Sequence, residues 1–132
     1  MITIENLTTF FRWEEEESLM IYLGGYHNSV RRILLQKIYH TFPDARYCHF
    51  GDIDVGGFLI YEDLCRKTGI PFTCYRMDLD TLTEYEAYGK ELTENDRAGI
   101  ERILKENPDV QYAEVLEYML SAGVKLEQEC IV

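Results

Sequence analysis

The chain has 132 residues, of which 46% are hydrophobic, and it carries a formal net charge of −11 at pH 7. This length supports a single domain, residues 1–132, with a modest core. The acidic balance argues against a nucleic-acid-binding surface in this chain itself, because phosphate contacts need lysine and arginine. No apolar run reaches the roughly 18 residues of a transmembrane helix and no signal peptide is visible, so we expect a soluble cytoplasmic protein.

Segments typical of strands and helices alternate over the first 77 residues. Strands are expected over residues 2–5, 19–25, 45–52 and 70–77. The helix after the second strand is capped by Asn28 or Ser29 and ends at Pro43, and the helix after the third strand stops at Gly69. An apolar face of the first helix is formed by Val30, Ile33, Leu34 and Ile38. This alternation predicts an α/β fold in which helices cover a mostly parallel, four-stranded sheet.

The remainder of the chain changes character and reads as a helical C-terminal extension. Thr93 caps one expected helix within residues 92–108, and a second helix within residues 110–123 ends at Gly123. The tail, residues 124–132, is expected to form a last strand. Residues 6–18 allow either a helix or a loop. Because the first residues enter a strand pattern without a lead-in, we expect a piece of a longer protein.

Acidic residues follow two of the expected strands. Glu5 closes the first strand, and Asp52 and Asp54 close the third. Ligands of open parallel sheets bind beyond the carboxyl ends of the strands, and neighbouring strands lie about 4.8 Å apart. Three converging carboxylates repel one another unless a cation neutralises them, which favours a hard divalent ion such as Mg²⁺.

Four further residues near the expected site are candidates for weaker phosphate or DNA contacts. Gly56 and Gly57 would let the backbone approach a ligand closely and leave N–H groups at a helix start. His27 and Arg31 lie near the same end of the sheet in this interpretation, although a histidine there could equally be structural.

These motifs resemble those of the Toprim domain, the Mg²⁺-binding catalytic module of topoisomerases, primases and related nucleases. The A subunit of topoisomerase VI has the pattern D-x-D-x-x-G, which Asp52, Asp54 and Gly57 match. The chain resembles the C-terminal domain of the Wadjet plasmid-defence nuclease family still more closely. The segments that carry this resemblance are TIENLTTF, YLGGYHN, HFGDIDVGGF, YRMDLDTL, ELTENDR and VKLEQE. One departure is Val55, where many relatives have proline.

The resemblance implies a Rossmann-like Toprim fold with Glu5, Asp52 and Asp54 as catalytic and metal-binding residues. The cofactor would be Mg²⁺ or Mn²⁺. Full-length proteins of this kind would cleave double-stranded DNA as homodimers, together with a condensin-like motor complex that recognises plasmids. The isolated chain is expected to be inactive alone, since the region that grips DNA would lie outside it.

The residues themselves leave two other functions open. A haloacid-dehalogenase-like phosphohydrolase or phosphoacceptor domain also places aspartates after a parallel strand, and it would form an acid-labile phosphoaspartate. A non-catalytic acidic module would bind a basic partner and would show no affinity for Mg²⁺ or Mn²⁺ at millimolar concentration.

Overall fold

A parallel sheet lies at the centre of the computed structural model, which describes residues 1–15, 17–26 and 28–131. Its four strands are β1 (Ile2–Ile4), β2 (Met20–Tyr22), β3 (Cys48–Phe50) and β4 (Thr73–Cys74). They are ordered β2-β1-β3-β4 and every pair is parallel. The predicted α/β class is therefore confirmed, and β1 and β3, which precede the acidic residues, are direct neighbours.

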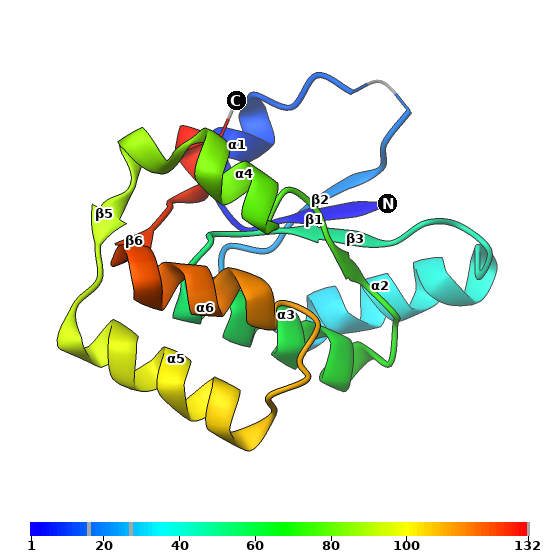
Figure 1. Ribbon diagram of the computed structural model, residues 1–132. Helices are drawn as coiled ribbons and strands as arrows, with labels where there is room; N and C mark the ends of the chain where they lie inside the picture. The colour runs from blue at the N-terminus through cyan, green and yellow to red at the C-terminus, as the bar shows by residue number, and fades with distance from the viewer. Residues whose placement is uncertain (16, 27, 132) are drawn as a thin grey trace.

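Helices cover both faces of this sheet. The helices of this part are α1 (Leu7–Phe11), α2 (Ser29–Thr41), α3 (Val55–Thr68) and α4 (Leu79–Glu84). Figure 1 shows α1 and α4 on one side of the strands and α2 and α3 on the other. The short helix α1 resolves the ambiguity of residues 6–18: Asn6 caps it by accepting a hydrogen bond from the Thr9 backbone N–H at 3.0 Å.

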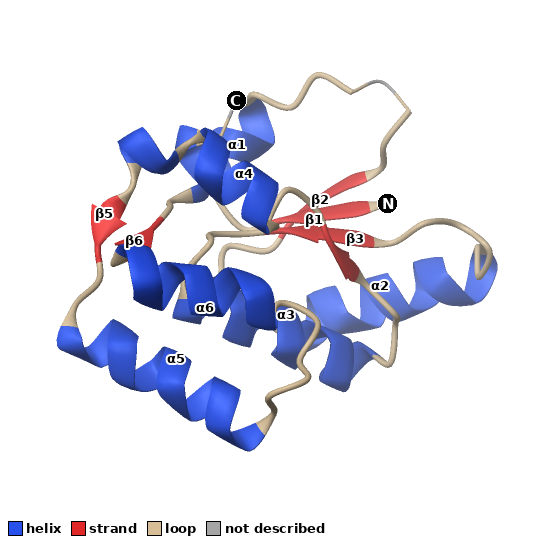
Figure 2. Ribbon diagram, viewed as in Figure 1, coloured by secondary structure: helices blue, strands red, loops and turns tan. Residues whose placement is uncertain are grey.

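The C-terminal part is mostly helical, with one small antiparallel strand pair. Its elements are η1 (Glu86–Tyr88), β5 (Lys90–Glu91), α5 (Glu94–Glu106), α6 (Ala113–Ala122), β6 (Val124–Lys125) and η2 (Gln128–Cys130). The expectation of a last strand over the whole tail was wrong in extent. Among the described residues of the tail, 124–131, two are in a strand, which pairs with β5, away from the central sheet (Figure 2). The following residues turn into η2.

The expected helix boundaries are confirmed by the capping geometry. Asn28 accepts a hydrogen bond from the Arg31 N–H, and Thr93 forms a reciprocal capping box with Asp96. Gly69 and Gly123 end α3 and α6 in the left-handed region, with φ of 71° and 69°.

The apolar face of α2 points differently from what its pattern suggests. Val30, Ile33 and Leu34 are 71%, 52% and 47% exposed, whereas Leu35 is fully buried. The pattern identifies which residues share a helix face but not which face packs on the rest of the molecule. Here Leu35, on an adjacent side of α2, is the fully buried residue.

One hydrophobic core joins the sheet to the C-terminal helices. It includes Ile4 and Phe50 of the sheet together with Leu116 and Met119 of α6. The Phe58 ring of α3 stacks on Tyr112 at the start of α6, with centroids 4.3 Å apart. Within the described residues, none of the helices has the length and apolarity needed to cross a membrane.

Candidate functional site

Glu5 lies directly after β1, at the carboxyl end of the sheet. Its backbone N–H donates to the Phe50 carbonyl at 3.1 Å, which fixes it beside the end of β3. The pKa of its carboxyl is raised to about 7, chiefly by burial and also by the negative charges of Asp52 and Asp54, while a backbone hydrogen bond from Asp52 opposes the shift. The charges of Asp52 and Asp54 therefore act on Glu5, and the joint role of the three residues stays a prediction.

Asp52 follows β3 and is held by the C-terminal segment. Its Oδ1 accepts a hydrogen bond from the Gln128 backbone N–H at 2.7 Å. Its pKa is raised to about 6, chiefly by burial, and this hydrogen bond opposes the shift because it favours the charged form. The negative charges of Asp54 and Glu127 contribute to the rise. Desolvation and the repulsion by neighbouring carboxylates thus both oppose the ionised form of Asp52, and the hydrogen bond from Gln128 favours it.

Asp54 has a structural task in addition to its position in the cluster. It is the N-cap of α3, and its Oδ1 accepts from the Gly57 N–H at 2.6 Å. Burial raises its pKa, and the same hydrogen bond and the positive charge of Lys125 lower it.

The two glycines after Asp54 have different roles. A Cβ on Gly57 would overlap the backbone oxygen of Asp52, so only glycine allows α3 to begin this close to β3. A Cβ on Gly56 would meet only the Asp54 carboxylate, at an ordinary 3.5 Å. Since the Gly57 N–H already donates to Asp54, its expected availability to a phosphate is not seen in this arrangement.

The C-terminal segment forms a second wall of the site that the sequence did not indicate. Gln128 is fully buried, and its side chain donates to the Phe50 carbonyl at 2.9 Å and accepts from the Asn6 N–H at 2.9 Å. Lys125 pairs with Asp96 at 2.7 Å while its charge acts on Asp54. No local pattern identifies these contacts, because Gln128 lies 122, 78 and 76 positions from Asn6, Phe50 and Asp52.

A cavity of ≈ 370 Å³ opens beside the carboxylates. Its lining comprises Glu5, Asn6, Leu7, Tyr22, Gly24, Gly25 and Asp52. The guanidinium carbon of Arg31 lies 5.9 Å from the centroid of the Tyr22 ring, so this predicted contact residue is next to a residue that lines the cavity but is not itself in the lining. His27, the other predicted contact residue, lies outside the described residues.

The donor chemistry of the site suits a hard divalent cation. Glu5 Oε2 is buried and has no hydrogen-bond partner within the described part of the chain, so it offers a desolvated oxygen. The raised pKa values of Glu5 and Asp52 show that positive charge is what the cluster lacks. In the described residues, however, no three His, Cys, Asp or Glu side chains are already arranged to hold a metal ion. One carboxylate oxygen of Asp52 and one of Asp54 already accept a hydrogen bond from a backbone N–H. The set of residues that would bind a metal ion therefore remains a prediction.

Comparison with known proteins gives one consistent result. The model of the family described as "Wadjet protein JetD, C-terminal" matches residues 1–132. The chain is also 32% identical, over 139 aligned positions, to Wadjet protein JetD of Bacillus cereus (strain Q1). That alignment covers all of this chain but 33% of the relative, so the chain spans about a third of the relative's length. From the match over its whole length, the chain belongs to the family of JetD C-terminal domains.

Proposed function

We propose that this chain is a metal-dependent DNA-cleaving domain of the Toprim kind, related to the catalytic part of the topoisomerase VI A subunit. The observation that carries the proposal is the group of acidic residues after β1 and β3, where burial raises the pKa of Glu5 to about 7 and of Asp52 to about 6. Buried carboxylates that repel one another at a sheet edge are costly for stability, and such perturbed groups cluster at functional sites. A hydrolytic metal site is a function that would explain the cost.

Glu5, Asp52 and Asp54 would hold Mg²⁺ or Mn²⁺ through their carboxylate oxygens. When bound, such an ion would neutralise the carboxylates and polarise a DNA phosphate. Glu5 would act as a proton acceptor, because a carboxylate beside the reacting oxygen can take up a proton. Asp54 would keep the start of α3 fixed while it contributes to the site, through its bond to the Gly57 N–H.

The proposed biological setting is defence against plasmids, as part of a Wadjet-type assembly with a condensin-like motor complex. Membership of the JetD family supports this setting. The net charge of −11 gives this chain little attraction for DNA, so other parts of a full-length homodimer would hold the duplex.

The test is plasmid cleavage by a full-length protein that contains this domain, with its partner complex present. Asp52→Ala and Glu5→Ala should each reduce Mg²⁺- or Mn²⁺-dependent cleavage by about 100-fold or more, because each removes a group from one shared site. Glu114→Ala removes an exposed carboxylate on α6 and serves as the matched control, with activity unchanged.

Full cleavage activity in Asp52→Ala would overturn the catalytic assignment. The two other functions predict different results: an acid-labile phosphoaspartate would indicate a phosphohydrolase or phosphoacceptor domain. Absence of Mn²⁺ binding together with retained partner binding would indicate an acidic interaction module.

A further inference from the structure

His49, in the middle of β3, is a fully buried histidine whose ring is fixed from two sides. Its Nδ1 lies 2.9 Å from the Thr3 hydroxyl on the neighbouring strand β1. Its ring stacks on Tyr61 of α3, with centroids 6.2 Å apart and an interplanar angle of 26°. The remaining nitrogen, Nε2, is buried and has no hydrogen-bond partner among the described residues. A buried polar atom left without a partner is costly, so its surroundings are informative.

The carboxylate oxygen Oε2 of Glu5 is another buried polar atom that has no hydrogen-bond partner among the described residues. Both atoms surround Gly51: a Cβ on this residue would lie 2.5 Å from Glu5 Oε2 and 3.0 Å from His49 Nε2. Because both atoms lie next to the same point, a direct hydrogen bond or a bridge by one water molecule would satisfy them together. The absence of a side chain at Gly51 is what leaves room for this approach.

The surroundings of Nε2 favour one tautomer of His49. The Thr3 oxygen lies 2.9 Å from His49 Nδ1 and 3.4 Å from the Cys48 carbonyl, so its one proton can go to either acceptor, and the Thr3 contacts alone are compatible with both tautomers. An ionised carboxylate accepts hydrogen bonds only, so a proton on Nε2 is what complements Glu5 Oε2. In that tautomer Nδ1 is the acceptor of the Thr3 hydroxyl proton.

We infer that His49 is a positioning residue for Glu5: its Nε2–H donates to Glu5 Oε2, directly or through one water, and the Thr3 hydroxyl donates to Nδ1. His49 itself touches neither DNA nor metal in this scheme. The inference deepens the proposed function, since it assigns an orienting partner to the acidic residue proposed as proton acceptor. Partners of this kind hold a functional carboxylate in one orientation, and their loss typically costs about 10- to 100-fold in metal affinity or activity.

The first test is independent of catalysis and uses the metal-free chain in a long-range proton–nitrogen NMR experiment on its histidines. We expect His49 to show the pattern of a neutral ring protonated at Nε2. Glu5→Ala should shift the Nε2 resonance much more than the Nδ1 resonance, and Thr3→Val should have the opposite selectivity. A ring protonated at Nδ1, or an Nε2 resonance that ignores Glu5→Ala, would overturn the inference.

The second test uses two amide substitutions that separate the two nitrogens. His49→Gln keeps a donor near the position of Nε2, whereas His49→Asn keeps a polar group near the position of Nδ1 only. In the full-length protein we expect His49→Gln to retain most plasmid cleavage and His49→Asn to lose about 10- to 100-fold. Equal losses in the two variants, with equal melting temperatures, would reduce His49 to a structural role.

The two tests also separate this inference from the proposed function. If wild-type protein cleaves no DNA with any divalent metal, the proposed function fails. The response of the His49 Nε2 resonance to Glu5→Ala would still support the contact between the two residues. If cleavage requires Asp52 and Glu5 but the Nε2 resonance is insensitive to Glu5→Ala, the proposed function stands and the positioning role of His49 fails.

Discussion

Folding shifts the pKa values of acidic side chains in opposite directions at the edge of the sheet and on α5. Burial raises the pKa values of Glu5 and Asp52, to about 7 and about 6. Asp96 on α5 has a lowered pKa, because the Lys125 ammonium 2.7 Å away and the Thr93 backbone N–H favour its charged form. The first group destabilises the metal-free fold at neutral pH, and the second stabilises it.

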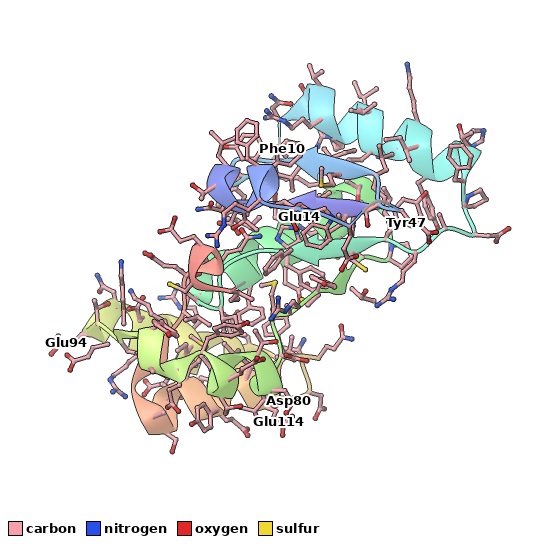
Figure 3. The ribbon with its side chains drawn as sticks, turned by 90° about the horizontal axis from the view of Figure 1, so that it is seen from above. Phe10, Glu14, Tyr47, Asp80, Glu94 and Glu114 are labelled. Atoms are coloured by element: carbon pink, nitrogen blue, oxygen red, sulfur yellow. The ribbon has the colours of Figure 1, made fainter. Side chains whose placement is uncertain are left out.

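Most of the net charge belongs to neither group. Asp80, Glu94 and Glu114 are exposed, and Figure 3 shows all three at the edge of the molecule. Such carboxylates remain solvated and contribute solubility rather than chemistry. The proposed function therefore rests on the few buried carboxylates, where repulsion is tolerated, and not on the overall charge of −11.

The strongest way to probe the sheet edge is to add one methyl group at Gly57. Gly57→Ala should lower the free energy of unfolding by about 3 kcal/mol or more, because the new Cβ would overlap the Asp52 backbone oxygen. Gly56→Ala is the matched control, with space for the methyl group and a gain of about 0.5 kcal/mol expected from helix propensity. Urea denaturation measures both, and similar stabilities of the two variants would refute the close approach of α3 to β3.

A smaller effect tests whether the ionised carboxylate of Glu5 lowers the free energy of unfolding. Without metal, Glu5→Gln should raise the free energy of unfolding at pH 8 by about 1 kcal/mol, a value reduced from the full shift because Glu5 is partly solvated. The pKa of Glu5 is higher in the folded state than its ordinary 4.5, so the folded chain binds the proton more tightly. The cost of ionising Glu5 therefore grows as the pH rises from about 4.5 to about 7.

The gain from Glu5→Gln should accordingly be absent below pH 4.5 and complete above pH 7. The difference between variant and wild type is the quantity to measure, because burial lowers the pKa of His49 to about 4 and makes the wild-type stability rise with pH in an overlapping range. Denaturation in EDTA at several pH values provides this difference. A destabilising Glu5→Gln at pH 8 would contradict the raised pKa.

The smallest expected effect has the opposite sign and lies in the other region. Asp96→Asn should lower the free energy of unfolding at pH 7 by about 0.5 kcal/mol, since it removes the charge that pairs with Lys125. Because the pKa of Asp96 is lowered from 3.8, this contribution exists above about pH 4 and disappears as the pH falls through the folded-state pKa. High salt should reduce the effect, and a stabilising Asp96→Asn would remove the contrast between the regions.

Local signals were sufficient for much of this fold. Asn28, Gly69, Thr93 and Gly123 mark helix ends by their own backbone chemistry, and each is found at the expected boundary. Alternating segments also identified the strands, and the positions of Glu5 and Asp52 at strand ends follow from them. These features depend on neighbours within a few residues, which a single sequence displays.

The features that could not be predicted depend on distant contacts. The exposure of Val30 and Leu34 on α2, next to the buried Leu35, could not be predicted because periodicity does not reveal which side of a helix meets the core. The hydrogen bonds of Gln128 to Asn6 and Phe50, and the pairing of β6 with β5, join segments far apart in the chain. Only the three-dimensional arrangement shows that the C-terminal segment closes one side of the acidic site.

The most direct test of the central claim is the melting temperature of the chain with and without millimolar Mn²⁺ at neutral pH. An ion that binds the buried carboxylates only in the folded state should raise the melting temperature by mass action, and Asp52→Asn should abolish the increase. Glu114→Gln, on the exposed surface of α6, should leave the increase intact. An unchanged melting temperature in Mn²⁺, or an equal increase in Asp52→Asn, would contradict a metal site at this edge of the sheet.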